Sequence, residues 1–311
     1  MKSASVMPRR GIGHTFWQQR YLMILTLPAV IWLIIFSYFP MYGVIIAFQD
    51  YNPIQGFIRS PWLGWDNYSE LFNDPTFISS LNTTLKISIY KLLFGFPAPI
   101  ILALLLNEIR SARFKKLVQS LTYLPYFVSW VLVAGFMYTL LSPETGILTQ
   151  LLAFVGLIDS NTMVMGNTNT FMSLVVISDI WKNIGWNSII FLAAIAGIDT
   201  QLYEAAVVDG AGRFKRIWYI TLPALKPTII ILLIFSVGGL INSNFDQMYV
   251  LQNSMTQDAA NVLSIYAYKS GIILGRFSYG TAVGLFQSVV AFVMVLGANY
   301  TSRKLTEESL F

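Results

Sequence analysis

The stretch YLMILTLPAVIWLIIF, residues 21–36, contains no charged side chain and decides the class of fold. It opens an uncharged run of 29 residues between Arg20 and Asp50. A helix needs roughly 20 apolar residues to cross the hydrocarbon core of a bilayer. The run is too long for the core of a signal peptide, and no small-residue cleavage pattern follows it. It therefore predicts a membrane span that is not cleaved from the chain.

Other apolar segments predict five more spans. Three are uncharged runs of 27, 19 and 26 residues, which lie between Lys116 and Glu144, between Lys226 and Asp246, and between Arg276 and Arg303. Two contain charges: residues 87–106 include Lys91, and residues 171–198 include Asp179 and Lys182. Lys86 and Lys91 lie near the end that we place outside, where we expect both to snorkel to lipid headgroups. The predicted fold is an all-α membrane protein with six transmembrane helices.

Composition supports this class and excludes others. Hydrophobic residues form 55% of the chain and charged residues only 11%, whereas soluble domains carry about 25% charged residues. Cysteine is absent, and the one histidine, His14, lies in a basic N-terminal segment. Disulfides, thiolate ligands and most histidine-based hydrolytic or zinc sites are thereby excluded or disfavoured. We predict no catalytic residue and no metal site.

The distribution of lysine and arginine predicts the orientation. With the N-terminus inside, fourteen of them fall in cytoplasmic segments, and three, Arg59, Lys269 and Arg276, fall outside. Such a bias marks the cytoplasmic face, and it accounts for the net charge of +5 without a nucleic-acid partner. The predicted organisation is a cytoplasmic tail (residues 1–20), a six-span domain (21–303) and a second cytoplasmic tail (304–311), in a bacterial cytoplasmic membrane.

One cytoplasmic loop, DTQLYEAAVVDGAGRFKRIWYITLPALKP at residues 199–227, is too long and organised for a turn. We expect a helix over 201–209, a left-handed stop at Gly210, and a second helix from Gly212 to about Ile220. Pro223 is expected to end that helix and open the next span. Small residues would let a partner protein approach closely, while an amphipathic helix resting on lipid is the alternative. The residues alone leave both readings open.

The loop resembles the EAA loop of binding-protein-dependent ABC importers. Glu204-Ala205-Ala206, Gly210, Ile220, Leu222 and Pro223 stand at that family's spacing. The extension Asp209-Gly210-Ala211, with SDIWK at 178–182 and GID at 197–199, is similar to the maltose-type carbohydrate branch, particularly its oligosaccharide permeases. The resemblance covers nearly the whole chain.

This resemblance implies a type I ABC importer permease fold. It implies a permease subunit for sugars or oligosaccharides, with partners that are a second permease, two ATPase subunits and an extracellular solute-binding protein. ATP and Mg would bind the ATPase, and no cofactor would bind this chain. The implied ATPase-coupling residues are Glu204, Ala205, Ala206, Asp209, Gly210, Arg213, Leu222 and Pro223. Consistently, the nearest imitation of a phosphate loop, GRFSYGT at 275–281, lacks the required lysine.

Two polar groups are candidates for the substrate pathway. Asp179 and Lys182 are three residues apart on one helical face and could pair, either lining the pathway or joining spans. A second cluster closes the fifth span, and its amides, carboxylate and aromatic ring suit a sugar or a solvated helix end equally. Its members are Asn242, Asn244, Asp246, Gln247 and Tyr249.

Breaks and loops complete the prediction. Pro97 and Pro99 interrupt the second span and Gly238-Gly239 the fifth, which permits kinks or close packing. The external stretch 50–77 exceeds a turn and should be ordered. The resemblance implies that this stretch contacts the binding protein, and a surface lid is the alternative.

Other functions remain open at this point. One is an ABC permease for amino acids or peptides. Another is a stand-alone secondary transporter, although the sequence shows no internal repeat of the kind that such transporters carry. The direction of transport rests on the resemblance, and the residues do not identify the sugar.

Overall fold

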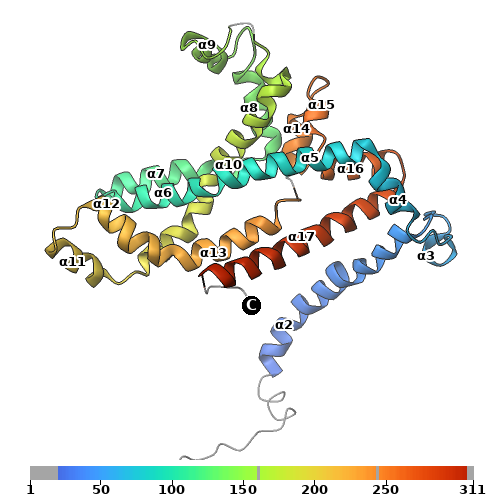
Figure 1. The fold of residues 1–311 in the computed structure, drawn as a ribbon, viewed down its shortest axis with the longest axis horizontal. Coiled ribbons are helices and arrows are strands. Elements are labelled where there is room, and N and C mark those ends of the chain that lie inside the picture. Colours follow the sequence, from blue (N-terminus) through green and yellow to red (C-terminus); the bar gives the residue numbers. More distant parts are fainter. Residues whose placement is uncertain (1–19, 160–161, 243–244, 307–311) are drawn as a thin grey trace, which may run out of the picture.

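The computed structural model describes residues 20–159, 162–242 and 245–306. Most of the predicted tails, residues 1–20 and 304–311, lies outside these ranges. The described chain is a bundle of helices (Figure 1), and its one β-bridge, between Gln49 and Trp62, stands outside any strand. Four helices are long and apolar enough to cross a membrane, and two bent pairs raise the number to six. The all-α fold with six spans is confirmed.

The first three spans differ in shape. The first runs from Arg20 to Phe48 and leaves the bundle at its N-terminal half, α2, which has no buried residue (Figure 1). The second runs from Pro75 to Glu108. The third is broken by a 104° bend between residues 127 and 130. Their elements are α2 (Arg20–Leu33), η1 (Ile34–Tyr38), η2 (Phe39–Phe48), α5 (Pro75–Tyr90), η3 (Lys91–Gly95), α6 (Pro97–Glu108), α7 (Ala112–Tyr123), η4 (Leu124–Phe127) and α8 (Trp130–Leu140).

The last three spans surround the predicted loop. The fourth is α10 (Thr168–Ala196), which turns by 71° into α11 (Thr200–Val208). The fifth is continuous from Arg213 to Gly238, and the sixth is α17 (Phe277–Thr306). Elements of the fifth span are α12 (Arg213–Arg216), η6 (Ile217–Thr221) and α13 (Leu222–Gly238). Short helices link the spans: α3 (Gly56–Arg59), α4 (Asp66–Asn73), α9 (Ile147–Phe154), η5 (Val164–Gly166), α14 (Phe245–Leu251), α15 (Gln257–Ala260), α16 (Leu263–Tyr268) and η7 (Lys269–Ile273).

Three of the prolines inside the spans follow wide, π-helical turns, while Pro28 and Pro227 lie within regular α-helix. The turns η1, η3 and η6 end just before the prolines at 40, 97 and 223. A proline lacks the amide that an α-helix needs and clashes with the carbonyl four residues earlier. A π-turn changes the pairing of that carbonyl, so the helix can continue. The predictions that Pro97 and Pro99 interrupt the second span, and that Pro223 ends a helix, are therefore wrong.

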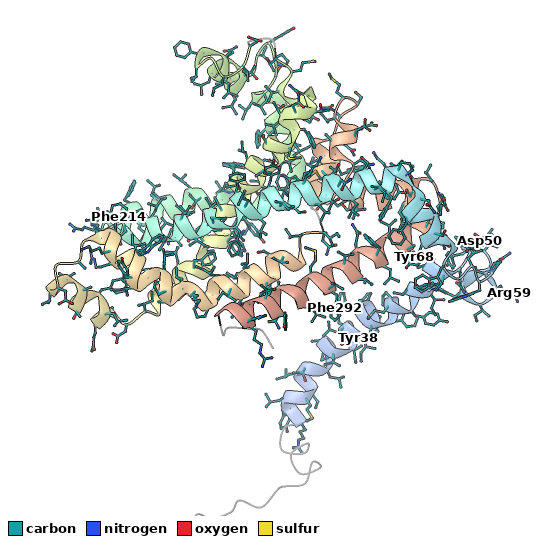
Figure 2. The ribbon with its side chains drawn as sticks, in the orientation of Figure 1. Tyr38, Asp50, Arg59, Tyr68, Phe214 and Phe292 are labelled. Carbon is teal, nitrogen blue, oxygen red and sulfur yellow. The ribbon has the colours of Figure 1, made fainter. Side chains whose placement is uncertain are left out.

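The predicted loop and the stretch 50–77 lie at opposite ends of the molecule. Figure 2 shows Phe214, which is 89% exposed, at one end, and Asp50 and Arg59 at the other. We call these the loop end and the opposite end. The stretch 50–77 is ordered as predicted: the buried amide of Asn67 donates to the carbonyl of Ala47 at 2.9 Å.

Close packing holds the fifth span against the sixth. A Cβ built on Gly238 would lie 2.4 Å from a methyl carbon of Val295, so a larger residue there would force the side chain of Val295 or the helix to shift. The predicted close approach at Gly238 is present, and α13 ends at this residue.

A hydrogen-bond network joins the start of the second span to α16 and α17 at the opposite end. Asp74 caps α5 by accepting from the amide of Thr76 at 2.7 Å. Its other oxygen accepts from the hydroxyl of Tyr266, which lies 2.6 Å from the hydroxyl of Tyr279. Burial and these hydrogen bonds raise the pKa of Tyr266, so its hydroxyl keeps its proton. Burial alone would raise the pKa of Asp74, but the hydrogen bonds from Tyr266 and Thr76 lower it below its ordinary value.

Replacing Tyr266 by Phe should weaken this network. The variant leaves a carboxylate without its strongest donor, so we expect the free energy of unfolding to fall by about 1–3 kcal/mol. Thermal unfolding of the purified protein in detergent measures the change. Tyr268→Phe is the control, because the contacts given for Tyr268 involve its ring only. Equal melting temperatures for the two variants would contradict the prediction.

Candidate functional site

The loop at residues 199–227 forms two short helices joined at Gly210. Asp199 caps α11 by accepting from the amide of Gln201 at 2.9 Å. Gly210 has a φ of +74°, and the amide of Ala211 donates back to the carbonyl of Ala206 at 2.8 Å. This is a left-handed helix stop, which glycine adopts at the lowest cost. The predicted stop is confirmed.

The predicted coupling residues lie on the surface of this loop. No residue of α11 or α12 is buried, and Val208 is 87% exposed. Glu204, Ala205, Asp209, Gly210 and Arg213 are exposed, Ala206 and Leu222 are half-buried, and Pro223 is exposed on α13. An exposed helix of small and apolar residues is a surface that a partner protein can cover.

Two contacts fasten the loop to the spans. Arg213 Nε lies 3.8 Å from Glu108 Oε2 at the end of α6. The hydroxyl of Tyr203 on α11 lies 2.9 Å from Oγ1 of the buried Thr221. Sequence reasoning missed Glu108, Tyr203 and Thr221, because nothing in their spacing indicates that they meet. Movement of the loop is thereby linked to α6 and to the fifth span.

A cavity of about 490 Å³ lies among the second, fourth and fifth spans. Its apolar lining includes Phe96 and Phe235. Its polar lining consists of Ser88, Lys91, Asp179, Asn183, Asn187, Ser236 and Asn242. Asp179 and Asn242 therefore border this cavity, and their role in a substrate pathway stays a prediction.

Lys91 is the main residue that sequence reasoning misplaced. Its Nζ lies 3.2 Å from Asp179 Oδ1 and donates to Gln247 Oε1 at 2.7 Å. The side chains of the ion pair are 17% and 16% exposed. The prediction that Lys91 snorkels to headgroups is wrong, because this chain offers a carboxylate and an amide within reach. Lys91 begins the turn η3.

Gln247 of α14 connects Lys91 of the ion pair to the fourth span. It is fully buried, and its Nε2 donates to the carbonyl of Val175 at 2.8 Å and to Ser178 Oγ at 3.0 Å. Asn183 Nδ2 donates to Asp179 Oδ1 at 3.2 Å. The network joins η3, α10 and α14, three segments far apart in the sequence.

Of the other predicted pathway residues, those that the structure describes do not line the cavity. Lys182 is buried on another face of α10, where it donates to backbone carbonyls, and Asp179 acts on it as a further electrostatic partner. Asp246 and Tyr249 are exposed on α14, whose buried face holds Gln247, Met248 and Leu251. Asn244 lies outside the described residues. For these residues a pathway role stays a prediction.

The described part of the chain contains no group of residues suited to bind a metal ion. Across the described residues, no three of His, Cys, Asp and Glu lie close enough to hold an ion.

These features define a class: a multi-pass membrane protein with a polar cavity among its spans and an exposed helical loop at one end. Residues 95–307 match the family described as "Binding-protein-dependent transport system inner membrane component". The match covers more than half of the chain, so the chain belongs to this family, whose members are permease subunits of the cytoplasmic membrane.

Relatives and solved structures agree with this family. Protein LplB of Bacillus subtilis is 43% identical over 94% of this chain and 92% of its own length. The polygalacturonan/rhamnogalacturonan transport system permease protein YteP of the same organism is also 43% identical, over 94% of this chain and 91% of its own. A crystal structure of a bacterial ABC transporter involved in the import of the acidic polysaccharide alginate matches with a TM-score of 0.86. That match is 40% identical and covers 95% of this chain and 99% of the other. The predicted ABC importer permease fold is confirmed.

Removing either partner of the Lys91–Asp179 pair should destabilise the protein, and removing both should cost less than the sum of the two single changes. Lys91→Met or Asp179→Asn alone leaves a partly buried charge without its counter-ion, at an expected cost of about 1–3 kcal/mol each. The double variant should cost less than the sum of the two. Thermal unfolding in detergent measures the cycle, and Lys86→Met, which removes an exposed lysine from the same span, is the control. Strictly additive costs would show that the two charges are not coupled.

Proposed function

We propose that this chain is one of two pore-forming permease subunits of an ATP-driven importer for oligosaccharides. The complex would contain a second permease, two ATPase subunits that bind ATP and Mg, and an extracellular solute-binding protein. The observation that carries the proposal is the continuity between the exposed loop and the cavity: α11 continues from α10, and α12 runs into α13. Both of these spans line the cavity.

The mechanism follows from this continuity. α11 and α12 would dock on an ATPase subunit, with Glu204, Ala205, Ala206 and Gly210 at the contact. Closure of the ATPases would displace the loop, and the displacement would pass to α10 and α13 directly and to α6 through the Arg213–Glu108 pair. Because α6, α10 and α13 enclose the cavity, their movement would alternate its access between the two sides of the membrane.

The lining of the cavity supports a saccharide substrate. Sugars need several hydrogen-bonding partners beside flat apolar surfaces. Asn183, Asn187 and Asn242 supply amides, and Phe96 and Phe235 supply aromatic faces. Similarity to YteP and to a chain of the alginate importer favours oligosaccharides over amino acids or peptides.

The proposal includes an orientation. The loop end, with Arg213, Lys215 and Arg216, would face the cytoplasm, and both termini would lie inside. The opposite end, with residues 50–77, would face the solute-binding protein. That a solved relative was crystallised in complex with an "alginate pentasaccharide-bound periplasmic protein" supports this assignment; its match has a TM-score of 0.86 and 39% identity, and covers 96% of this chain and 99% of that one.

Gly210→Asp should abolish the association with the ATPase. The substitution puts a side chain and a negative charge on the exposed left-handed turn between the two docking helices. We expect affinity purification of the tagged chain from native membranes to recover an ATPase with the wild type and to lose at least about 90% of it with the variant, which is a tenfold or larger fall in affinity.

The control is Gly275→Asp. Gly275 also has a positive φ, of +69°, and open space around it, but it precedes α17, whose first turn packs near α4 at the opposite end (Figure 1). This variant carries the same strain and charge and should keep the ATPase. Undiminished recovery of the ATPase with Gly210→Asp would contradict the role of the loop.

Uptake should require ATP hydrolysis. In proteoliposomes that contain the purified complex and its binding protein, we expect oligosaccharide accumulation with ATP and none with a non-hydrolysable analogue. Transport by this chain alone would instead identify a stand-alone transporter, and uptake of peptides but not saccharides would identify another branch of the family.

A further inference from the structure

The fourth span, α10, presents two polar faces with different surroundings. Asp179, Asn183 and Asn187 border the cavity. Lys182 and Gly185 instead face the bend of the third span, through contacts with residues 122–130. Side chains three or four residues apart share a helix face, which explains both sets. We call residues 122–130, where the third span turns by 104°, the elbow.

Lys182 is buried against the elbow, with 7% of its surface exposed. Its Nζ donates to the carbonyls of Tyr126 and Val128 at 2.6 Å each, and to the carbonyl of Pro125 at 3.3 Å. An ammonium group has three N–H donors, and these three hydrogen bonds account for all of them. Within the described chain, no carboxylate forms a salt bridge with Lys182.

Aromatic rings and a glycine also hold the elbow against α10. We call this whole set of contacts between the elbow and α10 the joint. The ammonium of Lys182 lies 5.5 Å from the ring of Tyr126 and 5.6 Å from the ring of Trp130. Trp186, one turn further along α10, stacks on Tyr126 with ring centroids 4.5 Å apart. A Cβ built on Gly185 would lie 2.1 Å from the carbonyl oxygen of Thr122, so the two backbones are in direct contact. Contacts of this number and closeness leave little room for the elbow to move against α10.

The position of Lys182 follows from the cost of a bend inside a membrane. A turn of 104° breaks the helical ladder. The carbonyl of Pro125 still accepts from the amide of Val128 at 3.1 Å, whereas the carbonyls of Tyr126 and Val128 accept from Lys182. Water cannot reach such groups in the hydrocarbon core, so the protein must supply donors. One lysine supplies three donors, and the carbonyl dipoles and aromatic faces balance its charge.

We propose that Lys182 is a positioning residue that fixes the elbow of the third span to the fourth span, so that both move as one rigid body. This inference rests on the proposed function, because it concerns how a displacement of the loop is transmitted. α10 bends into α11 at the loop end. The third span continues beyond the elbow as α8, which packs against α14. The joint therefore carries movement of the loop past the cavity to α8 and α14.

A cross-link across the joint tests rigidity without altering Lys182. The chain has no cysteine, so Tyr126→Cys with Trp186→Cys creates one defined pair. If the elbow and α10 move together, joining these positions with a short thiol cross-linker should leave ATP-driven uptake within about twofold of the uncross-linked double variant, a difference below about 0.5 kcal/mol. A loss of uptake on cross-linking, reversed by cleaving the linker, would show that the joint must flex and would overturn the proposal. The two single-cysteine variants control for the reagent.

Substitution of Lys182 tests its own contribution. Lys182→Met removes all three donors, so uptake should fall about tenfold or more, since hydrogen bonds to a charged group are worth that factor in a conformational equilibrium. ATPase should still co-purify, because α11 and α12 do not contact Lys182. The 126–186 cross-link should restore uptake in a Lys182→Met background, which a loss of general stability would not allow.

Each possible outcome of the Lys182→Met experiment leads to a test of the proposal. Normal uptake by Lys182→Met overturns the proposal. If that variant does not fold, the cross-link in the chain with Lys182 intact decides alone. If no ATPase accompanies even the wild-type chain, the proposed function fails; rigidity of the elbow is then still measured by the distance between spin labels at Val131 and Ile190, two exposed positions on α8 and α10. A narrow distance distribution that broadens in Lys182→Met supports the joint, and an unchanged one overturns it.

Discussion

The structure depends on one constraint: backbone polar groups within a membrane need partners from the protein itself. Straight helices meet this constraint without help, and the departures from them show how the chain meets it elsewhere. Before the prolines at 40, 97 and 223, the turns η1, η3 and η6 rearrange the hydrogen bonds so that the helix continues. Where the third span bends, Lys182 supplies donors from a neighbouring helix. Irregular backbone is therefore found where other residues compensate for it.

The same constraint explains why Lys91 and Lys182, the two lysines inside the bundle, have different partners. Both cations are placed among polar atoms of other segments, yet Lys91 pairs with a carboxylate at the cavity and Lys182 with carbonyls at the elbow. Asp179 stands between them on α10 and pairs with the lysine that is distant in sequence. A charge inside a membrane is expensive, so each one indicates a place where the fold needs it. Lys91 marks the cavity among the spans, and Lys182 marks the joint between the elbow and α10.

Several features could be predicted from residues alone. Uncharged runs of about the length that crosses a bilayer predicted four of the six spans, because such runs are unsuited to water. Gly210, between two helix-forming stretches, predicted a left-handed stop, because few other residues accept that backbone at low cost. The pattern Glu204-Ala205-Ala206 with Gly210 and Leu222-Pro223 predicted the family, which residues 95–307 confirmed. Each of these signals is local, so the order of residues is enough to read it.

Contacts between side chains that are far apart in the sequence could not be predicted from local patterns. Lys91 and Asp179 are 88 residues apart, and Lys182 meets carbonyls 54–57 residues earlier. Helical spacing instead suggested a pair between Asp179 and Lys182, which face different neighbours. The sequence by itself determined that the chain spans a membrane, how often, and where the exposed loop turns at Gly210, because burial in lipid and backbone geometry act residue by residue. Only the tertiary structure decided which charge meets which partner, because that depends on how the spans cross, and crossing is set by packing such as that of Gly185 on Thr122.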